Sequence, residues 1–183
     1  MPRPPAYKYN MNGFLNPESV LKQLKLKKTM TAADFGCGSG GWAFPLAKKL
    51  EEGKVFAIDI LEEPLSALKA RAKLEKFLNI ETIRSDVEDR NGSKLIDNSC
   101  DLVLMTNLLF EVENKKQVLE EGKRVLKPGG KILVVDWKPE SPMGPKESRI
   151  SAEEVKKTAK DLNLKLEKEF EAGSFHYSLV FIK

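Results

Sequence analysis

Short apolar runs alternate with helix-forming segments along most of this chain, and that alternation restricts its fold more than any other feature of the sequence. The runs lie at residues 31–35, 55–59, 80–84, 101–105 and 132–135, and segments with a helical apolar period lie at residues 41–50, 62–78 and 115–126. The last two expected strands, residues 165–171 and 175–182, are joined by so short a link that they must pair antiparallel. This order predicts a three-layer α/β/α sandwich whose sheet is mostly parallel and ends in an antiparallel hairpin.

The length of 183 residues predicts a single domain, since chains usually divide into separate cores only above roughly 250 residues. Residues 1–15 are aperiodic and are expected to form an N-terminal arm, a possible lid, ahead of a domain over residues 16–183. Asn16 and Pro17 have the residue types of a helix cap and a first helical position. Ser151 and Glu154 have the spacing of a capping box, which predicts another helix start.

Two finer features of the elements are also predicted from local signals. In the helix expected over residues 62–78, Leu65, Leu68, Ala72 and Leu74 are expected to face the core. The segment 127–130, with one Pro and two Gly, is expected to stop the preceding helix and make a tight turn before the next strand.

Composition and charge favour a cytoplasmic protein without a metal site. No apolar run approaches the roughly 18 residues that a membrane span needs, and residues 1–10 have no apolar centre for a signal peptide. Cys37 and Cys100 show no pairing pattern, and a single histidine with two unspaced cysteines gives no metal-ligand set. The net charge of +4 is spread along the chain, and the basic residues of segment 22–28 have the spacing of a solvated helix face more than of a nucleic-acid patch.

A glycine-rich turn follows the first expected strand. Gly36, Gly38 and Gly40 fall at alternate positions and would let the backbone turn sharply and approach a ligand closely, with the acidic Asp34 two residues before the first glycine. Asp59 ends the second strand, where an acid can bind both hydroxyls of a ribose. The plainer alternative for Asp59 is that it caps the next helix.

Two further polar positions follow strands that should end at the same edge of the sheet. Asp86 is separated from the third strand by Ser85 and could accept from the exocyclic amine of a purine, with Val87 packing on the ring; a plain turn aspartate is an equally good interpretation of this residue taken alone. Asn107 follows the fourth strand. Ligands of open parallel sheets bind beyond the carboxyl ends of the strands, so these residues are expected to share one site.

Over residues 16–183 the chain resembles class I S-adenosylmethionine-dependent methyltransferases. The resemblance rests on five segments in order: residues 33–40 (ADFGCGSG), 57–59 (AID), 86–87 (DV), 101–104 (DLVL) and 126–131 (LKPGGK). The last segment is typical of the branch that includes quinone-biosynthesis C-methyltransferases, and a dehydrogenase would not carry it before the fifth strand. The resemblance implies a Rossmann-like, seven-stranded, mostly parallel sheet.

The resemblance also implies which residues bind S-adenosylmethionine. The glycines would approach its methionine part, Asp34 would orient its amino group, Asp59 would take the ribose hydroxyls, and Asn107 would lie between the methionine part and the acceptor. The whole expected set is Asp34, Phe35, Gly36, Cys37, Gly38, Gly40, Asp59, Ile60, Asp86, Val87 and Asn107. Ile60, Asp86 and Val87 would surround the adenine.

The catalytic residues are unknown at this point, with three weak candidates. Glu111 could be a general base if it is buried, although a glutamate at a helix N-terminus is the plainer interpretation. His176 and Tyr177 lie on the last strand, where alternation puts them on opposite faces, and a structural role is the plainer interpretation of a single strand histidine. Many enzymes of this family need no dedicated base.

The acceptor of the methyl group is left open between three possibilities. A small or lipid-like molecule is favoured, because Tyr7, Tyr9, Met11 and Phe14 of the arm and Met143 of the loop 137–146 could line an apolar lid. The alternatives are a macromolecule (protein lysine or RNA) and a non-catalytic regulator that only binds the cofactor. Trp42 and Trp137 could line the acceptor site, although core packing is the better expectation for Trp42.

Overall fold

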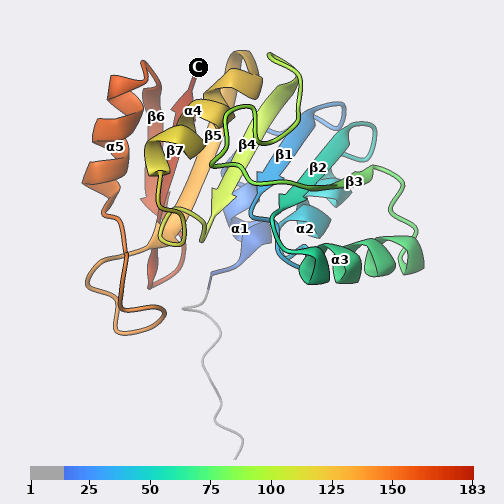
Figure 1. Cartoon of the computed structure of the whole chain (residues 1–183), viewed down its shortest axis with the longest axis horizontal. Helices are drawn as coiled ribbons and strands as arrows, with labels where there is room; N and C mark the ends of the chain where they lie inside the picture. The colour runs from blue at the N-terminus through green and yellow to red at the C-terminus, as the bar shows by residue number, and fades with distance from the viewer. Residues whose placement is uncertain (1–14) are drawn as a thin grey trace, which may run out of the picture.

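A computed structural model describes residues 15–183, and in this part of the chain all strands belong to one sheet (Figure 1). The helices are α1 (Pro17–Leu21), α2 (Ala43–Lys49), α3 (Glu62–Leu74), α4 (Lys115–Val125) and α5 (Ala152–Asp161). The strands are β1 (Thr31–Phe35), β2 (Lys54–Asp59), β3 (Ile80–Arg84), β4 (Cys100–Thr106), β5 (Leu126–Trp137), β6 (Lys165–Glu171) and β7 (His176–Ile182). Tyr7, Tyr9, Met11 and Phe14 of the expected lid lie outside the described residues.

The sheet has the order β3-β2-β1-β4-β5-β7-β6, in which β7 is antiparallel to both β5 and β6. The remaining neighbours pair in parallel. The predicted three-layer sandwich, with its mostly parallel seven-stranded sheet and C-terminal hairpin, is therefore confirmed. The order reverses between β1 and β4, and this point is where open α/β sheets bind ligands.

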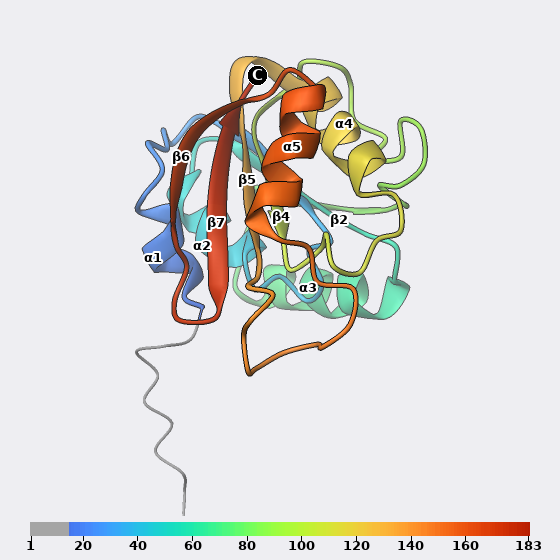
Figure 2. The same cartoon turned by 90° about the vertical axis from the view of Figure 1, so that its left-hand side faces the viewer.

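Two apolar layers hold the helices on the sheet, one on each face (Figure 2). Helices α1, α2 and α3 pack on one face through buried side chains that include Leu21, Leu46 and Leu68. Helices α4 and α5 cover the other face through Leu119 and Val155 among others. Since both faces are covered, the central strands carry continuous buried apolar runs, such as residues 102–105 and the predicted run at residues 132–135.

Local signals placed the helix starts correctly. The Asn16 side chain accepts a hydrogen bond from the Ser19 N–H at 3.2 Å, and Pro17 is the first helical residue. Ser151 and Glu154 form the predicted reciprocal capping box of α5.

The prediction that Leu74 faces the core is wrong. Nine residues separate it from Leu65, which turns it by about half a circle around the helix axis at roughly 100° per residue. Leu74 is 83% exposed accordingly, while Leu65, Leu68 and Ala72 are buried. The helix also ends at Leu74 and not at residue 78, because Lys76 takes a left-handed backbone conformation (φ 60°).

The segment 127–130 is not a tight turn before the fifth strand. It lies inside β5, which begins at Leu126 opposite Cys100 and then shifts register before Leu102 pairs with Lys131. Gly129, with φ 77°, allows this irregularity, and its N–H donates to the Lys183 carbonyl at 3.2 Å. A chain that leaves and rejoins a strand resembles a turn in sequence, because both use Pro and Gly.

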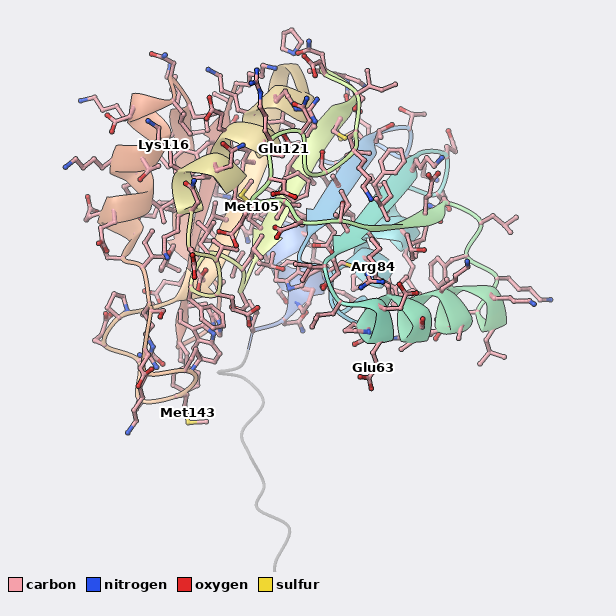
Figure 3. All side chains as sticks on the ribbon, in the orientation of Figure 1. Glu63, Arg84, Met105, Lys116, Glu121 and Met143 are labelled. Carbon is pink, nitrogen blue, oxygen red and sulfur yellow. The ribbon has the colours of Figure 1, made fainter. Side chains whose placement is uncertain are left out.

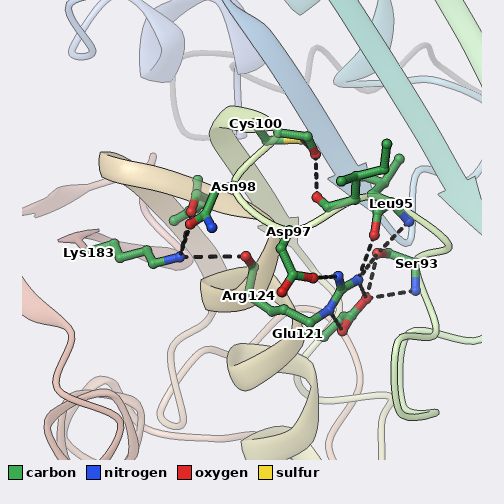
Figure 4. Close-up of polar contacts among 11 residues, drawn as sticks. Ser93, Leu95, Asp97, Asn98, Cys100, Glu121, Arg124 and Lys183 are labelled. Carbon is green, nitrogen blue, oxygen red and sulfur yellow. Dashed lines mark hydrogen bonds and ion pairs between the residues drawn. The ribbon is translucent and has the colours of Figure 1, made fainter.

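A buried ion network fixes the long connection between β3 and β4 to helix α4 (Figure 4). Glu121, fully buried on α4, accepts from the Ser93 N–H at 3.0 Å and from the Arg124 guanidinium at 2.7 and 2.8 Å. Arg124 also donates to the Leu95 carbonyl at 2.9 Å and pairs with Asp97. These bonds hold residues 93–97 close to the amino end of β4.

Candidate active site

The glycine-rich turn after β1 leaves one of its three glycines beside open space. Gly36, Gly38 and Gly40 all have positive φ angles (69°, 51° and 95°). A Cβ on Gly36 would meet Leu108 at 2.8 Å and one on Gly40 would meet Phe44 at 2.7 Å, whereas a Cβ on Gly38 would meet nothing within 4 Å. Gly36 and Gly40 are thus required by internal packing, and Gly38 is the glycine that leaves room for a ligand.

Asp34, beside this turn, is completely buried, and neither of its carboxylate oxygens has a hydrogen-bond partner. Burial, and secondarily the nearby charge of Asp59, raises the pKa of Asp34 to about 8. A buried carboxyl group without partners is costly in free energy. Such a group is suited to a ligand that supplies a cationic donor, for example the ammonium of an amino acid.

Asp59, at the end of β2, connects the first two strand ends. Its Oδ2 accepts from the Gly38 N–H at 2.8 Å and its Oδ1 from the Leu61 N–H at 2.9 Å. The plainer interpretation of Asp59 as the cap of the next helix is wrong, because α3 has Leu61 as its N-cap and no side chain caps it; the bond to Leu61 only closes a local turn before the helix. The bond to Gly38 spans 21 residues and shapes the ligand turn. Each oxygen retains a second lone pair that could accept from a hydroxyl group.

The residues expected around an adenine have mixed surroundings. Ile60 is 54% exposed, and Asp86 uses its Oδ1 to accept from the Glu88 N–H at 2.8 Å. Val87 is buried in the apolar layer under α4. The Ser85 hydroxyl, which sequence reasoning did not select, is buried without a partner next to them.

Asn107 follows the last residue of β4 in a left-handed conformation (φ 51°), and its N–H donates to the Val135 carbonyl at 2.8 Å. Its side-chain Oδ1 is buried and has no partner. Asn107 and Asp34 therefore present unpaired polar atoms at the ends of the adjacent strands β4 and β1. The two groups fit a ligand with its own donors at the reversal point of the sheet.

Asp136, the buried penultimate residue of β5, is a site residue that sequence reasoning missed. Its carboxylate accepts from the Trp137 N–H at 2.8 Å and from the Phe110 N–H at 3.3 Å, so it fixes the segment that follows Asn107. Burial raises its pKa to about 6 in spite of these hydrogen bonds. The signal was present, since Asp136 directly follows the apolar run 132–135, much as Asp59 follows an apolar run in β2.

The three catalytic candidates have different surroundings. Glu111 is exposed in the turn before α4, so the burial on which its role as a general base depends is not found. Partial desolvation, and then the charge of Asp59, still raise its pKa. The interpretation of Glu111 as a helix N-terminal residue is wrong, because α4 begins at Lys115 with Asn114 as its cap. The Tyr177 hydroxyl donates to the Ile150 carbonyl at 3.0 Å, a structural bond on the face that α5 covers.

His176 is buried on the opposite face and packs against the half-buried Trp137, with ring centroids 4.0 Å apart and ring planes tilted by 41°. Trp42 is buried in the α1–α3 layer, as expected, and Cys37 is buried too, which raises the pKa of its thiol. Figure 3 places Met143 at the outer end of the loop that follows β5, where its side chain is 41% exposed.

Neither a metal-ligand cluster nor a membrane-spanning helix is found among the described residues. Residues 15–183 contain no group of three or more His, Cys, Asp or Glu side chains arranged to hold a metal ion. No helix in the same range has the length and apolar character to cross a bilayer.

Comparison with known proteins agrees with this geometry. A model of the methyltransferase domain matches residues 26–178. The demethylmenaquinone methyltransferase of Shouchella clausii is 30% identical over 120 residues, which are 65% of this chain and 50% of that protein. The chain thus spans about half the length of the curated relatives it matches.

Solved structures show the same architecture over nearly the whole chain. An S-adenosylmethionine-dependent methyltransferase from Aquifex aeolicus is 30% identical with a TM-score of 0.85, over 96% of this chain and 93% of that one. The [4+2]-cyclase SpnF has a TM-score of 0.80 at 15% identity, over 91% of this chain and 79% of that one. The similarity to the cyclase shows a shared fold and nothing further.

Proposed function

The chain belongs to the methyltransferase-domain family, and from that premise we propose that it transfers the methyl group of S-adenosylmethionine to a small or lipid-like acceptor. The observation that carries the proposal is the fully buried Asp34 carboxyl, which has no partner and closely precedes the turn in which Gly38 adjoins open space. An ammonium group in that space would satisfy the carboxyl and remove the cost of its burial.

We assign the remaining binding roles to the residues at the strand ends. The Asp59 carboxylate would accept from the ribose hydroxyls while it holds Gly38, and Asn107 would use its unpaired Oδ1 on the methionine part. Asp86, Val87 and Ile60 would enclose the adenine, with Phe35 and Cys37 as packing support. When bound, S-adenosylmethionine supplies a methyl group already activated by its sulfonium.

The chain's own part in the transfer is to bind, orient and exclude water, which can provide much of the rate enhancement. Asp136 supports this by fixing the segment after Asn107 through the Phe110 N–H. Glu111 lies close enough to Asp59 for their charges to interact and is the candidate that could take a proton from an acceptor. An acceptor that is already nucleophilic would need no such base.

A small acceptor is supported by the demethylmenaquinone methyltransferases among the relatives. We keep the expected cytoplasmic location as part of the proposal, because the two cysteines are free, buried thiols.

Titration calorimetry with S-adenosylmethionine and S-adenosylhomocysteine tests the cofactor first. We expect micromolar binding of both, and no binding to Gly38→Val, whose side chain would fill the ligand space. Gly129→Val is the matched control, because Gly129 also has a positive φ and no atoms within 4 Å of its Cβ position but lies at the other end of the sheet. Failure of the wild-type protein to bind either compound would overturn the proposal.

Transfer of labelled methyl groups then identifies the acceptor. Reduced naphthoquinones, a protein extract and total RNA are offered in parallel to the wild-type protein and to Gly38→Val. Label in the quinol fraction supports the small acceptor, label only in protein or RNA replaces it with a macromolecule, and cofactor binding without any transfer supports a regulator.

A further inference from the structure

A buried histidine with no hydrogen-bond partner lies two strands from the proposed methyl-transfer point. His176 is 3% exposed, and neither of its ring nitrogens has a partner. Ser178, two residues further along the same face of β7, is likewise buried with an unpaired hydroxyl. Native proteins rarely leave buried polar atoms unpaired, so these two side chains indicate a missing partner.

The strand register places His176 at the edge of the sheet that carries the site. It pairs with Trp137, the last residue of β5, and so lies at the carboxyl end of the parallel strands. Asp34 is in line with Leu104, Leu133 and Val180 across the sheet. Since residues 176, 178 and 180 alternate onto one face, His176 and Asp34 project from the same face.

The distance between this histidine and the methyl-transfer point suits one small molecule. Strand β7 is separated from β4, whose end carries Asn107, by β5 only. Two strand spacings are about 10 Å. A fused aromatic ring system could therefore contact His176 at one end and the end of β4 at the other.

The loop of residues 138–149 holds Trp137 firmly beside His176. Gly144 has φ 83°, and a Cβ there would lie 2.6 Å from the Trp137 ring, so the loop backbone rests directly on the indole. The Arg149 guanidinium donates to the carbonyls of Lys138, Ser141 and Met143 at 3.1, 2.6 and 2.6 Å. It also donates to the carbonyls of two prolines in the same loop, at positions 139 and 145.

The electrostatics around His176 select an uncharged ligand group. The ammonium of the nearby Lys138 is paired with Glu171 at 2.7 Å, so its charge is already matched and does not favour an anionic ligand. Burial, and then the charge of Lys138, lowers the pKa of His176 to about 4, so the ring is neutral at pH 7 and a poor base. A neutral imidazole has one donor and one acceptor nitrogen, which together suit a hydroxyl group.

We propose that His176 is a positioning residue that hydrogen-bonds the hydroxyl group of a planar aromatic acceptor lying along Trp137. This inference rests on the proposed function. Ser178 gives the same ligand a second polar contact. The acceptor class is therefore a hydroxylated aromatic compound, which His176 holds in line for transfer. The proton that the methyl group replaces goes to Glu111 or to water, and not to His176.

The test uses the fact that the chain has a single histidine, so its imidazole signals in NMR need no assignment by mutation. The protein is saturated with S-adenosylhomocysteine and titrated with 1-naphthol or with 1-methoxynaphthalene, which cannot donate a hydrogen bond. We expect the His176 ring nitrogen shifts to move with 1-naphthol and to move much less with the ether. No movement, or equal movement with both probes, would overturn the proposal.

Variants give a second, independent readout. His176→Leu should weaken 1-naphthol binding about tenfold, the equivalent of one lost hydrogen bond, and His176→Gln should recover part of it. Tyr177→Phe is the control, because its hydroxyl binds the Ile150 carbonyl on the other face and its loss should leave 1-naphthol affinity unchanged. Unchanged affinity in His176→Leu would count against the proposal.

The affinity for S-adenosylhomocysteine distinguishes a failure of the proposed function from a failure of the proposed role of His176. It should be the same in all these proteins, since His176 is not assigned to cofactor binding. If the wild-type protein does not bind S-adenosylhomocysteine, the proposed function fails. If it binds and 1-naphthol leaves the histidine signals unchanged, only the role of His176 fails.

Discussion

At the scale of single residues, the site depends on a carboxyl group kept in an unfavourable environment. Asp34 is buried without a partner and its pKa is raised to about 8, so in the free protein at pH 7 it is mostly protonated. Binding an ammonium group favours the ionised form, and therefore binding must be coupled to release of this proton.

The sign of the resulting pH dependence follows from that coupling. Cofactor affinity should rise as pH increases from 6 towards 8, by at most about tenfold per pH unit, as the free carboxyl becomes easier to ionise. Calorimetry in two buffers of different ionisation enthalpy should detect proton release at pH 7. Asp34→Asn should bind weakly without proton release, and a wild-type protein that releases no proton would contradict the assignment.

Asp59 is expected to contribute to binding in two ways, as a ribose acceptor and as the support of Gly38. Asp59→Ala should weaken S-adenosylhomocysteine binding by roughly 1–3 kcal/mol, because hydroxyl groups would be left unpaired in a partly buried site. Calorimetry measures the change, and Asp59→Asn, which keeps one acceptor oxygen for the Gly38 N–H, should lose less. An unchanged affinity in Asp59→Ala would refute the ribose assignment.

At the scale of elements, the loop 138–149 is held by one side chain and not by secondary structure. Arg149→Ala would remove the shared donor of several loop carbonyls. Amide hydrogen exchange in this loop should become about tenfold faster or more, measured by mass spectrometry on peptides that span it. Lys146→Ala, an exposed change in the same loop, should leave the exchange unaltered. If Arg149→Ala exchanges like the wild type, the guanidinium does not fix the loop.

The ion network between α4 and residues 93–97 should matter far more for stability than the surface ion pairs. Glu121→Gln removes the charge from a fully buried group and should lower the free energy of unfolding by about 2 kcal/mol in urea denaturation. Glu75→Gln is the control, since it breaks the exposed pair with Arg71 and should cost less than about 1 kcal/mol. Equal losses in the two variants would show that burial adds nothing to the network.

At the scale of the whole molecule, ligand binding should stabilise the entire sheet. The proposed site joins the ends of β1, β2, β3 and β4, and these four strands form the centre and one edge of the sheet. S-adenosylhomocysteine at 100 times its dissociation constant should add about 2.7 kcal/mol to the free energy of unfolding. For a domain of this size the melting temperature should rise by roughly 5–10 °C in calorimetric scans. Gly38→Val should show no rise, and a ligand-independent melting temperature in the wild type would contradict binding to the native state.

The sequence by itself determined the order of the elements, the reversal of the last strand and the placement of glycines and acids after the strands. These features follow from apolar periodicity and from turn chemistry, which act between residues close in the chain. The same local reasoning wrongly predicted that Leu74 faces the core and that residues 127–130 form a turn. Local patterns do not determine which side of a helix faces the sheet, nor which strand the end of another strand pairs with.

The tertiary structure decided what surrounds each of these residues. Three of the contacts join positions 20 or more residues apart: the bond from Gly38 to Asp59, the bond from Phe110 to Asp136, and the tilted ring contact of His176 with Trp137. The unpaired state of Asp34 depends on burial by several elements. Desolvation and hydrogen-bond partners are set by such distant neighbours. The local pattern can therefore supply a carboxylate or an imidazole at a strand end, but the packing of the whole sheet sets its charge and leaves it available to a ligand.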